Sequence, residues 1–185
     1  MSLEKLKEKA KAVEAKNPKA AIAAWEEAIS FQEEHADPNP DVTLYNKVGD
    51  LYLKAGDPAK GADAYERAVD TYAELGFHNN AIAMCNKVLR NAPGRTHIYL
   101  KLAKLFASKG FLAEAKQHFL DYAERMQRAG RVNQAVAALK EFADISPEAD
   151  ELRDILGEHL KAYGATDKRR SSVATKAPEP PKPKG

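Results

Sequence analysis

The fold is decided by residues 45–68, which read YNKVGDLYLKAGDPAKGADAYERA. Apolar residues recur at helical spacing on both sides of Gly56-Asp57-Pro58. Glycine tolerates the positive φ that ends a helix, and Asp-Pro is typical of a helix start, with a side-chain cap followed by proline in the first turn. Gly49 lets a neighbouring helix approach closely. The stretch therefore predicts two tightly packed helices.

The chain repeats itself without a gap when Tyr45 is superposed on Tyr99. The same register superposes Gly56 and Gly110, Tyr65 and Phe119, Gly76 and Gly130, and Pro93 and Pro147. Asn17-Pro18 joins the pattern in a different register, superposed on Asp57-Pro58, behind a charged capping helix. A third copy continues through one helix only. These patterns predict nine helices, at 3–15, 18–34, 42–55, 58–75, 78–91, 96–109, 112–129, 132–144 and 148–163.

These motifs resemble the tetratricopeptide repeat over about residues 17–164. The resemblance lies in Tyr45-x2-Val48-Gly49-x2-Tyr52 followed by Gly61-x3-Tyr65-x2-Ala68, and again in Tyr99-x2-Leu102-Ala103-x2-Phe106. A 54-residue unit is similar to the three-helix or SNAP-like variants of this family. The resemblance implies an all-α fold, a right-handed α-α superhelix in which successive helices pack antiparallel, and a protein-binding function.

Composition excludes several other classes of protein. A formal net charge of +2 gives no argument for nucleic-acid binding. No stretch is apolar enough to span a bilayer, and the charged N-terminus lacks the apolar run of a signal peptide. The single cysteine, Cys85, fits a reducing, cytoplasmic environment and a buried packing position. We expect a repeat domain over 1–164 and a disordered, basic, proline- and lysine-rich tail over 165–185.

The resemblance implies a partner-binding groove lined by outward positions of the first helix of each unit. The candidates are Asn46, Asp50 and Leu53 in the first unit, His97, Leu100 and Lys104 in the second, and Ile155 and Tyr163 in the last helix. Asp50 stands where a carboxylate clamp requires an amide, so that clamp is not expected. The competing interpretation is that these positions form an ordinary solvated face that binds no partner. For Leu53 and Leu100, the competing interpretation is that a neighbouring long helix covers them.

Catalytic motifs are missing from the sequence. His-Glu-x-x-His, a P-loop, a dinucleotide-binding glycine motif and a nucleophile elbow are all absent. We therefore expect no catalytic residue, metal or cofactor. The resemblance implies a scaffold that binds a peptide or helix of a partner protein. The alternatives are a structural subunit that self-associates into a homo-oligomer through the unfinished third copy, and a chaperone or adaptor for a client protein.

Overall fold

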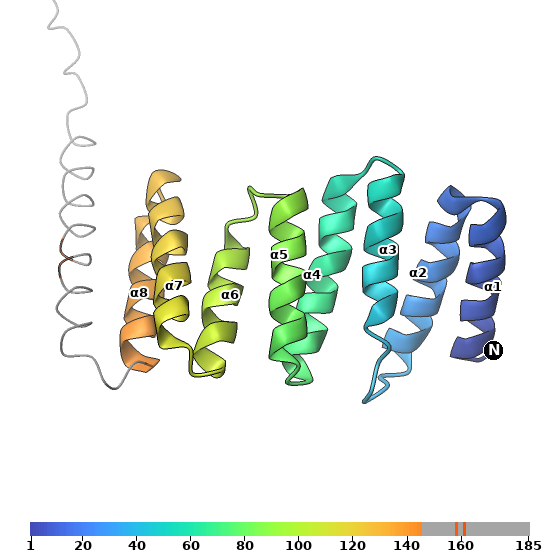
Figure 1. Ribbon diagram of the computed structural model, residues 1–185, viewed down its shortest axis with the longest axis horizontal. Helices are drawn as coiled ribbons and strands as arrows, with labels where there is room; N and C mark the ends of the chain where they lie inside the picture. Colours follow the sequence, from blue (N-terminus) through green and yellow to red (C-terminus); the bar gives the residue numbers. More distant parts are fainter. Residues whose placement is uncertain (146–157, 159–160, 162–185) are drawn as a thin grey trace, which may run out of the picture. The chain divides into compact units, whose positions relative to one another are not determined.

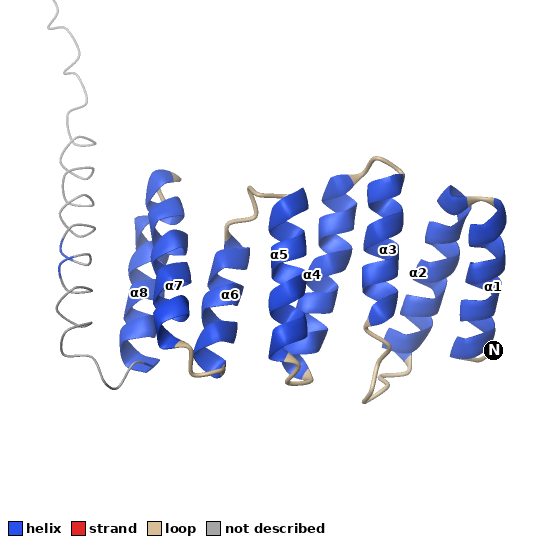
Figure 2. Cartoon of the chain, viewed as in Figure 1, coloured by secondary structure: helices blue, strands red, loops and turns tan. Residues whose placement is uncertain are grey.

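The computed structural model describes residues 1–145, Glu158 and Lys161. Residues 1–145 form eight α-helices and no strand: α1 Leu3–Lys16, α2 Pro18–Glu34, α3 Thr43–Lys54, α4 Pro58–Glu74, α5 His78–Asn91, α6 His97–Ser108, α7 Leu112–Arg128 and α8 Val132–Ile145 (Figures 1 and 2). The all-α prediction is confirmed for this part of the chain, and the first eight predicted helices agree closely with these bounds. The ninth predicted helix lies outside the described residues.

The chain divides into two compact units, Met1–Phe111 with α1 to α6 and a second unit that begins at Leu112 and contains α7 and α8. Consecutive helices of the first unit are joined alternately at opposite ends, so each is antiparallel to the next (Figure 1). Every consecutive pair from α1 to α6 packs together.

Ion pairs link alternate helices of the first unit. Glu14 of α1 meets Lys47 of α3 at 2.6 Å, and Asp50 of α3 meets Lys87 of α5 at 2.6 Å. Arg67 of α4 meets two residues of α2, Glu26 at 3.1 Å and Glu33 at 3.0 Å. Asp70 of α4 meets Lys101 of α6 at 2.5 Å. The helices therefore form two layers, a first layer of α1, α3 and α5 and a second layer of α2, α4 and α6.

The helix ends follow the local chemistry of the sequence. Asn17 Oδ1 accepts hydrogen bonds from the backbone N–H groups of Lys19 and Ala20, and Asp57 Oδ1 accepts one from Lys60. Each bond satisfies an N–H that the first helical turn leaves without a partner. The glycines after α3, α4, α6 and α7 have φ between 77° and 83°: Gly56, Gly76, Gly110 and Gly130. The predicted caps and glycine stops are confirmed.

Small and large residues alternate in the core. Ala21, Ala28 and Ala68 are fully buried beside large side chains such as Trp25 and Tyr65. Small residues bring helix axes together, and large ones fill the remaining space to the close packing of protein interiors. In the second unit the rings of Phe119 and Phe142 lie 5.1 Å apart, and α7 and α8 pack through them.

Helix bounds recur along the chain. The bounds of α3, α4 and α5 coincide with those of α6, α7 and α8 in the register that superposes Tyr45 on Tyr99. The bounds of α2 likewise coincide with those of α4 in the register that superposes Asn17 on Asp57. Repetition of the sequence pattern thus produces repetition of local structure.

Candidate partner-binding surfaces

A polar cavity opens between α1 and α3 in the first unit. It has a volume of about 450 Å³ and is lined by Lys7, Lys11, Trp25, Asp41, Thr43, Leu44, Asn46, Lys47 and Asp50. Trp25 and Leu44 are buried and supply its apolar part. The outward side chains of α3 supply amide, hydroxyl and carboxylate groups, which can bind the backbone or polar side chains of a peptide.

Lys87 of α5 organises the outward side chains of α3. Its Nζ donates to Asn46 Oδ1 and to Asp50 Oδ1, at 2.6 Å in each case, and lies 4.5 Å from the centre of the Tyr65 ring. The Tyr65 hydroxyl also donates to Asp50 Oδ1, at 2.6 Å. Burial alone would raise the pKa of Asp50, but the hydrogen bonds from Lys87 and Tyr65 outweigh it and hold the pKa below its usual value. Burial and the bond to Asp50 together raise the pKa of Tyr65.

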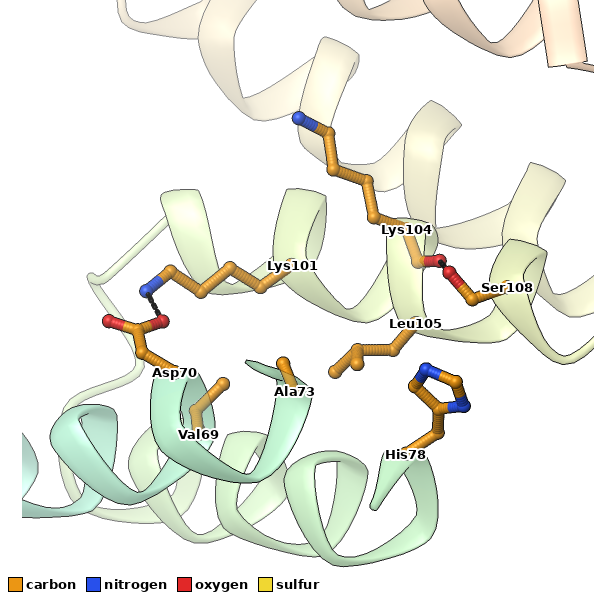
Figure 3. Close-up of a pocket in the computed structure, with 8 residues that line it drawn as sticks. All are labelled: Val69, Asp70, Ala73, His78, Lys101, Lys104, Leu105 and Ser108. Atoms are coloured by element: carbon orange, nitrogen blue, oxygen red, sulfur yellow. Dashed lines mark hydrogen bonds and ion pairs between the residues drawn. The ribbon is translucent and has the colours of Figure 1, made fainter. Parts of the chain in front are cut away.

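A second cavity, here named the α4/α6 trough, lies on the second layer. It has a volume of about 240 Å³ and is lined by Val69, Asp70, Ala73, His78, Lys101, Lys104, Leu105 and Ser108. Figure 3 shows Val69, Ala73 and Leu105 between the Asp70–Lys101 ion pair at one end and His78 at the other. The trough therefore offers an apolar floor with polar groups at its rim.

Glu66 anchors the charge network beside the trough. Its carboxylate accepts from Arg95 Nη1 at 2.8 Å and contacts His97 Nε2 at 2.9 Å, and Lys101 Nζ lies 3.9 Å away. Burial would raise the pKa of Glu66, but the hydrogen bonds from Arg95 and His97 and the charges of His97 and Lys101 lower it overall. The charged side chains between α4 and α6 are thus held in fixed positions.

The structure places the predicted site residues on two surfaces. Asn46 and Asp50 line the polar cavity, whereas Lys104 lines the α4/α6 trough. His97 is exposed and paired with Glu66. Leu53 packs against the core cluster around Tyr65.

The other three predicted site residues are not among the described residues that line the two cavities. Leu100 is half-buried on α6. Ile155 and Tyr163 lie outside the described residues, so the predicted self-association through the last helix stays a prediction.

Sequence reasoning missed the residues that complete each cavity. Lys7 and Lys11 come from the capping helix α1, and Asp70 and His78 come from α4 and the start of α5. The repeat pattern contains a signal for Asp70, because the long helix α4 can also be aligned as the first helix of a repeat, with Tyr65 superposed on Tyr45. On that alignment Asp70 takes the outward place that Asp50 holds on α3.

Cys85 occupies the packing position predicted for it. The side chain is fully buried in the cluster that contains Tyr65 and Val88, and burial raises the pKa of its thiol to about 12. Within residues 1–145 and the two described residues of the C-terminal part, no three His, Cys, Asp or Glu side chains are grouped to hold a metal ion. None of the described helices is long and apolar enough to cross a membrane.

The family model of the tetratricopeptide repeat matches residues 42–71 and 62–95. Residues 42–95 of the chain therefore carry tetratricopeptide repeats. Such repeats generally mediate protein–protein interactions, and the fold family is typically non-catalytic. The two matched segments overlap within α4, which is the second helix of one match and the first helix of the next. The 54-residue unit stays a prediction.

Solved structures of several other proteins are similar to this chain. One structure of MamA aligns with a TM-score of 0.49 and 17% identity, covering 96% of this chain and 98% of that one. A putative kinesin light chain from Podosopora anserina aligns with a TM-score of 0.40 and 15% identity, covering 90% and 96%. YrrB, described as a TPR protein with an unusual peptide-binding site, aligns with a TM-score of 0.28 and 16% identity, covering 83% and 88%. No curated protein matches the sequence.

Proposed function

We propose that the chain is a non-catalytic scaffold that binds a peptide or helix of a partner protein in the polar cavity between α1 and α3. The observation that carries this proposal is the cavity itself, whose α3 wall consists of the outward side chains Thr43, Asn46 and Asp50. A concave site with a small apolar floor and several fixed polar groups is typical of ligand binding.

The α3 wall is held in place before any partner binds. Asp50 accepts from Tyr65 and Lys87, and Asn46 Oδ1 accepts from the same lysine. The structure shows no hydrogen bond from Asn46 Nδ2 to another described residue, so this amide is available to donate to a backbone carbonyl. A fixed wall supports affinity because fewer side chains lose freedom when the partner binds.

The α1 wall adds cations to the cavity. Lys7 is paired with Asp41 at 3.0 Å, whereas Lys11 is exposed at the rim. Lys11 can therefore contact an acidic group of a partner without giving up an ion pair that the structure shows. The same proposal places the scaffold in the cytoplasm, on the support of its single, buried cysteine.

The proposal is tested by selecting peptides on the full chain from a displayed random-peptide library and measuring the affinity of synthetic copies by fluorescence anisotropy. We expect peptides whose binding to Asn46→Ala and to Lys11→Glu is about tenfold weaker, the size of one lost charge-assisted or buried hydrogen bond. Lys104→Glu, a change on the other layer, is the matched control and should leave these peptides unaffected. If every selected peptide binds Asn46→Ala and Lys11→Glu as tightly as the parent, the proposed site is wrong.

A further inference from the structure

Two carboxylates line the polar cavity, and a lysine holds each of them. Lys7 Nζ lies 3.0 Å from the carboxylate of Asp41, and Lys87 Nζ lies 2.6 Å from that of Asp50. The two lysines differ in position, because Lys7 lines the cavity itself whereas Lys87 is not among the lining residues. Lys87 therefore acts on the cavity through the side chains that it holds.

One ammonium group holds both polar side chains of the α3 wall. Asn46 and Asp50 are four residues apart, so they lie one turn apart on the same face of α3. Lys87 Nζ donates to Oδ1 of each, at 2.6 Å in both cases. The side chain of Lys87 is 23% exposed and that of Asp50 is 43% exposed, so the carboxylate is the more accessible member of the pair.

The charge of Lys87 sets what Asp50 can bind. Opposite charges at 2.6 Å largely cancel at the distance of a bound partner. A lysine or arginine of a partner that approached Asp50 would also approach the Lys87 ammonium group, and the repulsion is weakly screened because the pair is partly buried. The partner's cation would lose hydration as well. A neutral side chain or a backbone group meets no such repulsion.

Tyr65 has a different role at the same carboxylate. Its hydroxyl donates to Asp50 Oδ1 at 2.6 Å, so it helps to fix the position of Asp50. The hydroxyl carries no positive charge and cannot neutralise the carboxylate. Replacing Lys87 with a neutral side chain therefore leaves Asp50 bonded to Tyr65 and presents its negative charge to the cavity.

We infer that Lys87 is the specificity-determining residue of the polar cavity: it makes the α3 wall reject lysine and arginine and select a partner segment that presents neutral polar side chains or backbone groups there. Because Lys87 occupies Asn46 Oδ1, the wall meets the carbonyl oxygens of that segment with Asn46 Nδ2. Specificity is a difference between two affinities, and repulsion of the wrong partner contributes to it. The inference rests on the proposed function, since it takes the polar cavity as the binding site, and it adds the chemistry of the segment.

The test uses peptides that the full chain selects from the displayed library and that bind Asn46→Ala more weakly. Each position of such a peptide is replaced in turn by lysine and by glutamine, and each pair of peptides is compared by fluorescence anisotropy. We expect a position at which lysine binds the parent about tenfold more weakly than glutamine. At that position Lys87→Met should abolish or reverse the preference for glutamine, because Asp50 then carries an uncompensated charge. Lys87→Arg keeps the positive charge and should keep the preference.

Two further variants complete the test. Asp50→Asn removes the carboxylate and leaves the charge of Lys87, so the disadvantage of lysine should increase. Lys101→Met is the matched control, because the same substitution breaks a comparable ion pair, that of Lys101 with Asp70 at 2.5 Å in the α4/α6 trough. It should leave the ratio of the two affinities unchanged.

The outcomes separate this inference from the proposed function. If Lys87→Met weakens the lysine and glutamine peptides by the same factor, Lys87 only supports the wall; the inference is then wrong and the proposed function stands. Equal binding of both peptides to the parent at every position also overturns the inference. If no selected peptide depends on Asn46, the proposed function fails and the inference fails with it. Should circular dichroism show that Lys87→Met is unfolded, Asp50→Asn decides, and an unchanged disadvantage of lysine in that variant overturns the inference.

Discussion

The ring of Tyr65 lies in the space that a β-carbon on Gly49 would occupy. The Cε1 atom of the ring is 2.2 Å from the ideal position of that β-carbon, and Cδ1 is 2.6 Å from it. Tyr65 is fully buried, and its hydroxyl is bonded to Asp50 on the same helix as Gly49. The close approach of α3 and α4, and with it the placement of Asp50 in the polar cavity, therefore depends on glycine at position 49.

Replacing Gly49 with alanine should destabilise the first unit. The added methyl group overlaps the ring, and the Tyr65–Asp50 hydrogen bond opposes a shift of the ring. Overpacking of this kind costs about 1–3 kcal/mol, although alanine's better helix propensity offsets up to about 1 kcal/mol. The measurement is the free energy of unfolding from denaturant titration followed by circular dichroism. Gly94→Ala is the control, because nothing lies within 4 Å of its ideal β-carbon position and its φ is not positive. Equal stability of both variants would show that α3 and α4 pack less closely than described.

Ala135→Trp should disrupt the second unit. Ala135 is fully buried on α8, and the core there is already filled by Phe119 and Phe142. The predicted loss is more than the ~1–3 kcal/mol of ordinary overpacking, since indole is much larger than a methyl group. Hydrogen exchange of α7 and α8 amides measures the effect locally. Gln134→Trp places the same side chain on the exposed face of α8 and should leave the exchange rates near those of the parent.

Removing the Tyr65 hydroxyl should affect Asp50 directly. Tyr65→Phe deletes the 2.6 Å hydrogen bond and leaves Lys87 as the remaining bonded partner of the carboxylate. We expect the pKa of Asp50 to rise towards its usual value, and stability to fall by about 0.5–1.5 kcal/mol. Carboxyl titration by NMR and denaturant unfolding measure the two effects. Tyr52→Phe is the control, because the structure shows no hydrogen bond from the Tyr52 hydroxyl to a described residue. An unchanged pKa of Asp50 would contradict the described geometry.

Local structure could be predicted from the sequence because its causes are local. Asn17 and Asp57 cap the helices that follow them, and Gly56 and Gly76 end helices with positive φ, as their residue types indicate. Cys85 was predicted to pack in the core, because it takes the place that Leu139 takes one copy later, and it is fully buried.

The arrangement of the candidate site could not be predicted in the same way. The outward residues of α3 and α6 are equivalent by sequence, and this equivalence predicts that they line one partner-binding groove. However, α6 follows α3 by three helices, and successive helices alternate between the two layers. The two equivalent helices therefore lie in opposite layers. Asn46 and Lys104 therefore line different cavities. The sequence register defines the face of a helix, whereas the layer depends on the number of helices that separate the copies.

Acid should destabilise the first unit. Burial opposes ionisation of Glu14, Asp41, Asp50 and Glu66, but hydrogen bonds and nearby cations lower the pKa of each carboxyl overall. In the unfolded chain the ordinary pKa values of these groups are 4.5 for Glu and 3.8 for Asp. Between those values and the lower pKa values of the folded state, the unfolded state binds more protons than the folded state. Stability from these groups is therefore fully present at neutral pH and is lost as the pH falls through the lower, folded pKa values. Denaturant unfolding at a series of pH values measures this, and a curve that stays level down to pH ~3 would contradict it.

Cys85 should be unreactive in the folded protein. Its thiol is fully buried, and burial raises the pKa to about 12, so almost none of the nucleophilic thiolate is present near neutral pH. A thiol reagent such as Ellman's reagent should therefore react at the rate at which the helices around α5 open, and much faster once denaturant unfolds the chain. Gly49→Ala should increase the labelling rate, because Tyr65 and Cys85 belong to the same core cluster and lower stability increases the open population. Gln134→Trp, a change at an exposed position of α8, is the control and should leave the rate unchanged. Rapid labelling of the folded parent would show that Cys85 is accessible and that the packing of α4 against α5 is not as described.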